Sequence, residues 1–464
     1  MAARGNKVLV IGLDCATPQL VFDAWRNDLP NLRRLMAEGL YGPMRSTIPP
    51  ITVPAWSSFF SGKNPGKLGF FGFRNRTRGT YHDMWIATSE AVREDRVWDI
   101  ASRAGKDVVV LGVPQTYPPK PLRGLMVTCF LTPGIDSEYT YPPALKQEIA
   151  EVVGAYMLDV EGFRTEDKER LLRQIHEMTV KRFKLARHLL RTKPWDLFIL
   201  VEMGPDRLHH GFWKFFDKEH RKYEPRNPYE NATKEYYVAL DREVGELLSL
   251  VSDDVNVIVC SDHGAKRMEG SFNVNDWLVQ TGFMTLQEPL SGPVPLKEAR
   301  VDWRRTKAWG LGGYFSRVFL NVAGREPEGA VNPGQYDQVR EELREALLSI
   351  EDDRGRRMNT KVYRPQDVYS GPYVWEAPDL IVYFDDLYWR AGGDVGNRSL
   401  YSFETEIGPD DAVHAEDGIF ILRRPDRAPT GKVSGVQIYD GAPTILALLG
   451  LPVPADMEGR IIHL

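Results

Sequence analysis

Cysteine is scarce in this sequence, and long apolar runs are absent from it. The chain of 464 residues has three cysteines, at 15, 129 and 260, which are too few and too scattered for a disulfide framework or a zinc ribbon. No segment is continuously apolar over a membrane span, and the N-terminus shows no signal-peptide core. These absences predict a cytoplasmic protein with reduced cysteines and no membrane contact.

An excess of positive charge is also lacking. Lysine and arginine number 59 against 64 acidic residues, a formal net charge of −5, and no basic block is dense enough to attract nucleic acid. Hydrophobic residues make up 42% of the chain and charged residues 27%, which is ordinary for a globular protein with a large core. We therefore expect no nucleic-acid partner. The sequence does not define an oligomeric state.

The stretch 256–264, NVIVCSDHG, is the centre of the interpretation. Its β-branched run 257–260 is typical of a strand buried on both faces of a parallel sheet. Asp262 and His263 follow at the C-terminal end of that strand, where ligands bind in open α/β sheets. Aspartate and histidine are metal ligands, but a helix cap beside a surface histidine has the same local pattern. The choice depends on whether other segments supply ligands.

Two further strands end in possible ligands. Residues 8–13 (VLVIGL) predict a buried strand, and Asp14 follows it as either a ligand or a helix cap. Another predicted strand precedes GPDRLHHGFW, in which Asp206 and His210 are four residues apart and share one helical face. His209 points elsewhere on a helix, so it is a poorer ligand, although it could contact a substrate.

A threonine and a late histidine complete the set. Three nearby prolines hold the chain extended around Thr52, and we expect a helix over 55–62 just past it. A hydroxyl at a helix N-terminus is well placed to attack an anionic phosphorus centre, and a metal ion would activate it. By local sequence alone, a threonine that only caps the helix is the more common case. His414 precedes a predicted strand at 419–422 and alone is typical of a surface residue.

These candidate ligands fall into two sets at the ends of strands in one predicted sheet. The first set is Asp14, Thr52, Asp262 and His263, and the second is Asp206, His210 and His414. Two cations about 4 Å apart would hold the attacking and leaving oxygens of an in-line phosphoryl displacement. The sequence therefore predicts two divalent metal ions. Histidine suits zinc, while aspartate also tolerates manganese.

The order of predicted elements indicates an α/β protein with a mostly parallel sheet sandwiched by helices. Residues 271–410 are richer in turns, glycine and proline, so we expect a smaller inserted α+β lobe that closes over the sheet edge, with residues 1–270 and 411–464 forming the catalytic core. Arginines in and near this lobe could bind a substrate anion, although solvated basic loops are the simpler interpretation. They are Arg74, Arg76, Arg304, Arg305 and Arg317.

Together the motifs resemble those of the alkaline phosphatase superfamily, and within it the type I phosphodiesterase/nucleotide pyrophosphatase-like phosphohydrolases. The resemblance covers nearly the whole chain and rests on VIGLDCATP, TIPPITVPAWSSFFSG, GPDRLHHGFW, SDHG and HAEDGIFIL. It implies an alkaline phosphatase-like fold and a two-metal mechanism with a covalent phosphothreonine on Thr52.

The sequence departs from this family pattern in two respects. Nucleotide pyrophosphatases of the group carry Asn three residues after the nucleophile, where this chain has Ala55, and many members have a signal peptide. The C/S-x-P-x-R motif of sulfatases is absent around Thr52. We favour a metal-dependent phosphodiesterase acting on a small phosphorylated metabolite. The alternatives are a phosphomonoesterase or phosphomutase with the same site, and a non-catalytic binding protein, which the complete ligand set disfavours.

Overall fold

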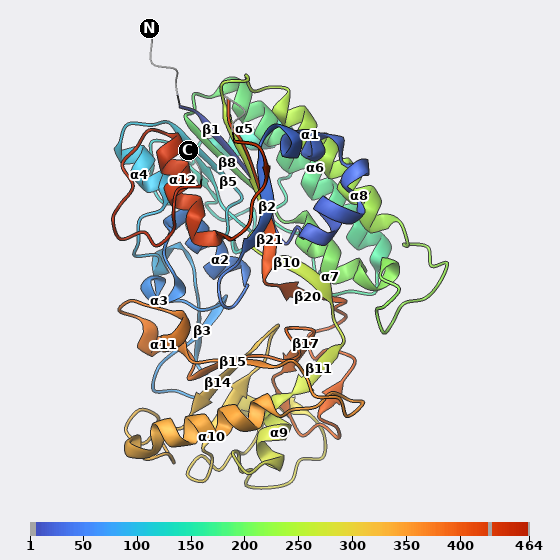
Figure 1. The fold of residues 1–464 in the computed structure, drawn as a ribbon, viewed down its shortest axis with the longest axis vertical. Coiled ribbons are helices and arrows are strands. Elements are labelled where there is room, and N and C mark those ends of the chain that lie inside the picture. The colour runs from blue at the N-terminus through green and yellow to red at the C-terminus, as the bar shows by residue number, and fades with distance from the viewer. Residues whose placement is uncertain (1–5, 426–428, 463–464) are drawn as a thin grey trace.

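The computed structural model of the chain describes residues 6–425 and 429–462. Figure 1 shows a large α/β part at the top and a smaller part built of sheets and helices at the bottom. The strands of the large sheet are β1 (Val8–Leu13), β2 (Leu40–Arg45), β5 (Val108–Leu111), β6 (Gly124–Val127), β7 (Thr140–Tyr141), β8 (Leu197–Glu202), β9 (Asn256–Cys260), β21 (Asp417–Arg423), β22 (Gly431–Lys432) and β23 (Val436–Gln437).

The large sheet is mostly parallel, as the sequence predicts. Its order is β22-β2-β21-β9-β1-β8-β5-β6-β7, with β23 beside β2. The central strands β9, β1, β8, β5 and β6 run parallel, while β21 lies antiparallel between β9 and β2. Every residue of β1, β8 and β9 is buried, which explains why these strands are apolar runs without polar alternation.

Helices cover both faces of this sheet. One group contains α1 (Pro30–Glu38), α5 (Leu145–Val153), α6 (Lys168–Thr192), α7 (Gly204–Phe216) and α8 (Ala232–Leu248). The other contains α2 (Thr52–Ser61), α3 (Pro65–Leu68), α4 (Val97–Arg103) and α12 (Gly441–Leu448). In Figure 1 the two groups lie on opposite sides of the sheet, and the helices within each group contact one another. No helix among residues 6–425 and 429–462 is long and apolar enough to cross a membrane.

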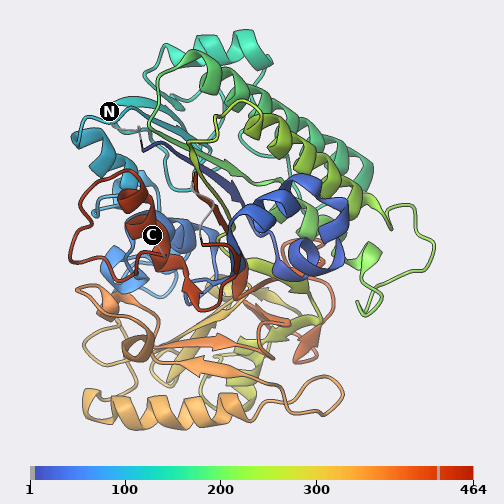
Figure 2. The same cartoon turned by 45° about the horizontal axis from the view of Figure 1, so that its top comes forward.

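The smaller part has its own sheets and its own core. Its main sheet has the order β13-β14-β16-β15, and a second has β17-β11-β19. Their bounds are β11 (Gly270–Asn273), β13 (Ala308–Leu311), β14 (Ser316–Leu320), β15 (Lys361–Tyr363), β16 (Leu380–Tyr383), β17 (Trp389–Gly392) and β19 (Tyr401–Ser402). Helices α9 (Val274–Gln280) and α10 (Tyr336–Leu348) contact β13 and β15. Figure 2 shows α10 along the outer edge, far from the large sheet. We call residues 271–410 the lobe.

A hairpin from the first part of the chain joins the lobe core. Strands β3 (Arg74–Arg76) and β4 (Met84–Ile86) pair antiparallel, and Tyr81 between them stacks on Trp303 with ring centroids 3.6 Å apart. Tyr81 is buried in the same hydrophobic cluster as Phe272 and Trp309. The lobe core therefore includes a segment that lies well before residue 271.

Two short strands connect the lobe to the large sheet. Strand β10 (Gly264–Arg267) begins at the glycine of the SDHG segment, and β20 (Ala412–Ala415) follows the lobe. They pair antiparallel, with Ala265 opposite His414. This register brings the last predicted ligand back beside the C-terminal end of β9.

Candidate metal centre and active site

Polar side chains converge where the parallel strands of the large sheet end. Asp14 follows β1, Asp206 lies in the first turn of α7 after β8, and Asp262 and His263 follow β9. These strands are direct neighbours in the sheet, so their C-terminal ends open into one region. All of these side chains are buried.

The first predicted set surrounds the ring of His263. Its Nε2 atom lies 3.2 Å from Asp262 Oδ2, 3.8 Å from Asp14 Oδ1 and 3.3 Å from Thr52 Oγ1. Thr52 is the first residue of α2, so this helix begins three residues earlier than expected, and its hydroxyl contacts the histidine instead of capping the helix. The structure thus brings the four residues of this set together.

The second predicted set lies beside the first. Asp206 Oδ1 is 3.4 Å from His210 Nε2 and 3.8 Å from His414 Nε2, and the two Nε2 atoms are 3.3 Å apart. The rings of His414 and His263 stack with centroids 3.8 Å apart and planes at 18°. The two ligand sets are therefore immediate neighbours.

The outer nitrogen of each histidine ring is already engaged. Nδ1 of His414 lies 2.7 Å from the Pro50 carbonyl oxygen, and Nδ1 of His263 lies 3.1 Å from that of Gly264. A carbonyl only accepts, so both Nδ1 atoms donate, and the Nε2 lone pairs face the cluster of candidate ligands. His210 Nδ1 lies 2.7 Å from Asp410 Oδ1 in the same manner. This is the arrangement by which proteins orient histidine ligands to a metal.

One oxygen of each carboxylate in the first set lacks a hydrogen bond within the described residues. Asp14 Oδ1 and Asp262 Oδ2 are buried and have no hydrogen-bond partner in the described part of the chain. Burial and the neighbouring Asp206 raise the pKa of Asp14, and burial and Asp14 raise the pKa of Asp262. Charged carboxylates at these positions require a cation. Together with His263 their atoms lie within 4.8 Å of one another, so the residues present fit a divalent metal ion.

The second set differs in its charge. Burial acts to raise the pKa of Asp206, but His210 and Arg207 hold it well below the usual value. Burial acts to lower the pKa of His210, but Asp410 and Asp206 raise it to about 9. A metal ion at this set would therefore have to displace a proton from His210.

Packing beneath the site holds Asp14 in place. Trp56 Nε1 donates a 2.7 Å hydrogen bond to Asp14 Oδ2. A side chain at Gly12 would come within 2.5 Å of the Trp56 ring, so only glycine lets the indole pack closely enough against β1 to reach the carboxylate. Arg207 donates to Asp206 Oδ2 at 2.6 Å and to Asp159.

A cavity of about 350 Å³ opens onto this cluster. Thr52, Asp206, His210 and His414 form part of its wall. The rest comes from Phe73, Phe130, Asp159, Phe163, Arg164, Arg207 and Tyr314. The last of these lies in the turn GGYF between β13 and β14, so the lobe supplies part of the wall.

Three of the other predicted substrate contacts lie away from this cavity. His209 is fully buried, and the hydroxyl of Tyr237 lies 3.1 Å from its Nε2 atom. His209 does not line the cavity. Its position therefore gives no support to a contact with the substrate. Arg76 pairs with Glu326 and lies over the Phe319 ring inside the lobe, which is a structural role. Arg304 is 83% exposed and pairs with Glu328.

Arg305 is exposed on the lobe surface, which is typical of a solvated residue. Arg74 and Arg317, by contrast, line a second cavity beside the first.

Sequence reasoning missed several residues that surround the ligands. Asp410 holds His210, and Arg164 donates to both Asp410 Oδ2, at 3.1 Å, and the Tyr314 hydroxyl, at 2.6 Å. Arg207 directly follows Asp206 in the sequence, and this position could have identified it as a partner of that carboxylate. Asp410 and Tyr314 come from turns of the lobe that carry no periodic pattern.

The fold and the arrangement of these acidic and histidine side chains are those expected for the alkaline phosphatase superfamily. The model of the type I phosphodiesterase / nucleotide pyrophosphatase family matches residues 8–410. The chain belongs to this family, whose members are metal-dependent phosphoric ester hydrolases. No curated protein sequence matches the chain.

Solved structures show the same fold at low sequence identity. Human ectonucleotide pyrophosphatase/phosphodiesterase 5 is 13% identical, with a TM-score of 0.54 over 98% of this chain and 97% of that chain. Sinorhizobium meliloti phosphonoacetate hydrolase, in complex with phosphonoformate, is 15% identical with a TM-score of 0.62 over 96% and 95%. An inactive variant of the murine phosphodiesterase 5, in complex with AMP, is 14% identical with a TM-score of 0.53 over 97% and 96%.

Proposed function

We propose that the chain is a two-metal phosphodiesterase that cleaves small phosphate esters through a covalent phosphothreonine on Thr52. One observation carries this proposal. The Thr52 hydroxyl lies 3.3 Å from His263 Nε2 and lines the cavity that also exposes Asp206, His210 and His414. A nucleophile, a metal-binding histidine and a substrate-sized space thus meet at one point.

Two ligand sets support two ions. Asp14, Thr52, Asp262 and His263 would hold one, and Asp206, His210 and His414 would hold the other. Three histidine nitrogens favour zinc, and manganese is the alternative. When bound, the ions would stabilise the negative charge on the attacking and leaving oxygens and favour the ionised Thr52 hydroxyl.

The residues of the chain position and stabilise the reacting groups. Thr52 Oγ1 forms a bond to phosphorus while the ester P–O bond breaks and the alcohol leaves. Water then cleaves the phosphothreonine, releasing a phosphate monoester and restoring the Thr52 hydroxyl. Thr52 is at the N-terminus of α2, where the helix dipole favours the negative phosphoryl group. Arg164 and Arg207 lie on the cavity wall, where their ion pairs with Asp410 and with Asp206 hold these two carboxylates in place.

The cavity supports a small organic ester as the substrate class. A volume of about 350 Å³ suits a metabolite. Phe73, Phe130, Phe163 and Tyr314 supply an aromatic wall for the ester group. Ala55, at the position of the nucleotide-binding Asn of related enzymes, is fully buried beneath this site, so the proposal does not extend to nucleotides.

Hydrolysis of bis-p-nitrophenyl phosphate, compared with p-nitrophenyl phosphate, tests the proposal when measured with zinc and with manganese. We expect faster cleavage of the diester, loss of that cleavage in Thr52→Ala, and a phosphorylated Thr52 peptide after acid quenching. Thr192→Ala, at an exposed threonine in the last turn of α6, is the matched control and should retain wild-type rates. A monoester preference would favour the phosphatase or phosphomutase alternative. Turnover of neither ester would contradict the proposal.

A further inference from the structure

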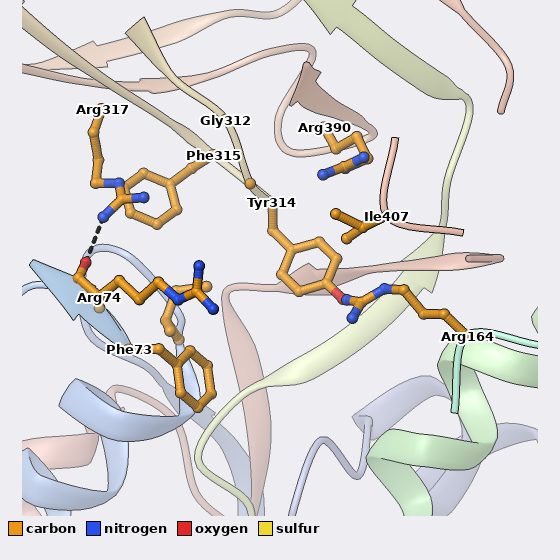
Figure 3. Close-up of a pocket in the computed structure, with 12 residues that line it drawn as sticks. Phe73, Arg74, Arg164, Gly312, Tyr314, Phe315, Arg317, Arg390 and Ile407 are labelled. Carbon is orange, nitrogen blue, oxygen red and sulfur yellow. Dashed lines mark hydrogen bonds between the residues drawn. The ribbon is translucent and has the colours of Figure 1, made fainter. Parts of the chain in front are cut away.

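A second cavity, of about 290 Å³, adjoins the metal cavity. The two share Phe73, Arg164 and Tyr314 in their walls. Figure 3 shows the second cavity between the hairpin that carries Tyr314 and the segment that carries Phe73 and Arg74. Four arginines line it, and we call it the arginine pocket: Arg74, Arg164, Arg317 and Arg390.

Two of these arginines are already neutralised by acidic residues. Arg164 pairs with Asp410, and Arg390 makes two hydrogen bonds to Glu406, at 2.7 and 3.0 Å. Their guanidinium groups therefore have carboxylate partners before any ligand arrives. They shape the wall of the pocket on the side of Ile407 (Figure 3).

Arg74 and Arg317 differ, since neither has a carboxylate partner within the described residues. Arg317 donates from Nη1 to the Arg74 carbonyl oxygen at 2.5 Å, and its Nε atom is buried without a hydrogen-bond partner. In Figure 3 the Arg74 guanidinium extends over Phe73 toward Tyr314. Burial and the charge of Arg74 lower the pKa of Arg317 to about 10, which leaves it charged at neutral pH.

Arg74 and Arg317 thus place two positive charges on the wall of the same cavity. A partly buried guanidinium without a carboxylate partner is stabilised when an anion binds beside it. A guanidinium presents a planar set of N–H donors that matches a carboxylate or a phosphate. Ile51, Phe73 and Phe315 line the same pocket, so the group that joins the anion to the rest of a ligand can be apolar.

We propose that the arginine pocket binds a second anionic group, a phosphate or a carboxylate, on the substrate whose ester phosphate occupies the metal centre. This inference rests on the proposed function, since the metal cavity must hold the ester. The common wall of Phe73, Arg164 and Tyr314 lets one ligand extend from one cavity into the other. Arg74 and Arg317 would select the charged end.

Matched phosphodiesters test the inference. Each carries a p-nitrophenyl leaving group and an alkyl arm of increasing length that ends in a methyl group, a carboxylate or a phosphate. We expect the wild-type protein to hydrolyse one charged series with a kcat/KM about tenfold above that of the methyl series, as charge-assisted hydrogen bonds allow. The end group with the larger ratio identifies the anion.

Variants assign that preference to the pocket. Arg74→Gln and Arg317→Gln should each reduce the ratio of charged to methyl kcat/KM toward one. Arg304→Gln, at the exposed arginine outside the pocket, is the matched control and should keep the wild-type ratio. Because the Arg74 side chain is exposed, its variant tests the inference even if Arg317→Gln does not fold.

The outcomes separate this inference from the proposed function. If the wild-type protein hydrolyses bis-p-nitrophenyl phosphate but shows no preference for either charged arm at any length, the arginine pocket inference is wrong and the proposed function stands. A preference that persists unchanged in Arg74→Gln also overturns the inference. Absence of bis-p-nitrophenyl phosphate hydrolysis overturns both.

Discussion

The phenol ring of Tyr314 lies on the imidazole of His414, with ring centroids 4.3 Å apart and planes at 29°. Its hydroxyl lies 3.2 Å from His210 Nδ1 and donates to Asp410 Oδ2 at 3.1 Å. One side chain of the lobe therefore contacts both histidines of the second ligand set. The lobe therefore contacts the candidate metal centre as well as the cavity beside it.

This contact predicts different effects for two substitutions of Tyr314. Tyr314→Phe keeps the stacked ring and removes the hydroxyl, so kcat/KM for bis-p-nitrophenyl phosphate should fall by less than about tenfold. Tyr314→Ala removes both, and the loss should exceed tenfold because His414 and His210 lose a positioning contact. Tyr223→Ala, on the loop before α8, serves as the control. A Tyr314→Ala variant with the wild-type kcat/KM would show that the ring does not position the ligands.

The two ligand sets predict the metal content of single variants. His414→Gln removes a ligand of the second set, and Asp262→Asn removes one of the first. We expect two ions per wild-type chain and about one in each variant after dialysis, measured by inductively coupled plasma mass spectrometry. Asp337→Asn, at an 86% exposed residue, should retain both ions. A wild-type content of one ion would contradict the assignment of two sets.

The hydrogen bond from Trp56 to Asp14 predicts a change in metal affinity. Trp56→Phe keeps an aromatic ring under the site but removes the donor to Asp14 Oδ2. Loss of such a contact weakens metal binding by about 10–100-fold, which competition with a chromogenic chelator would measure. Trp98→Phe is the matched control, because the buried Trp98 Nε1 has no hydrogen-bond partner within the described residues. Equal affinities in the two variants would rule out this role for Trp56.

The buried carboxyl of Asp411 leads us to expect that the stability of the protein depends on pH. This carboxyl is buried, Oδ2 has no hydrogen-bond partner among the described residues, and burial raises its pKa to about 7 although Lys214 lies nearby. The folded chain therefore binds more protons than the unfolded chain between about pH 4 and 7, so this group lowers stability as pH rises through that window. Asp411→Asn should remove the contribution of this group to the slope and raise the free energy of unfolding at pH 8 by about 1–3 kcal/mol.

Urea unfolding of the metal-free proteins at pH 5 and pH 8 measures this effect. The difference between Asp411→Asn and wild type should be larger at pH 8, where the wild-type carboxyl is ionised. Asp337→Asn should follow the wild-type slope, since that side chain is exposed. Parallel slopes for Asp411→Asn and wild type would contradict the prediction.

Features encoded in short stretches of sequence were predictable. The apolar run at 8–13 forms β1 with the predicted bounds, and the mostly parallel sheet follows from several such runs. The seven candidate ligands meet because Asp14, Asp262 and His263 follow strand ends, and because the helices α2 and α7 and the strand β20 carry the others to the same edge of the sheet. Zinc, the cytoplasmic location and the roles of these residues stay predictions.

Contacts that depend on tertiary packing were not predictable. Arg76 and Arg317 look alike in the sequence, yet Arg76 finds Glu326 as a partner, while Arg317 has no carboxylate among the described residues. Asp410 becomes important only because α7 places His210 against it. Such pairings follow from how the lobe folds onto the sheet, and periodicity carries no information about that.

The pairing of β10 with β20 has a consequence during synthesis on the ribosome. Asp14 emerges near the start of translation, whereas His414 emerges only after the whole lobe has been made. A nascent chain that stops within the lobe carries Asp206 and His210 but lacks His414, so the second ligand set is incomplete. A metal ion bound at that set would then be captured late, would join distant segments of the chain, and would stabilise only the finished protein.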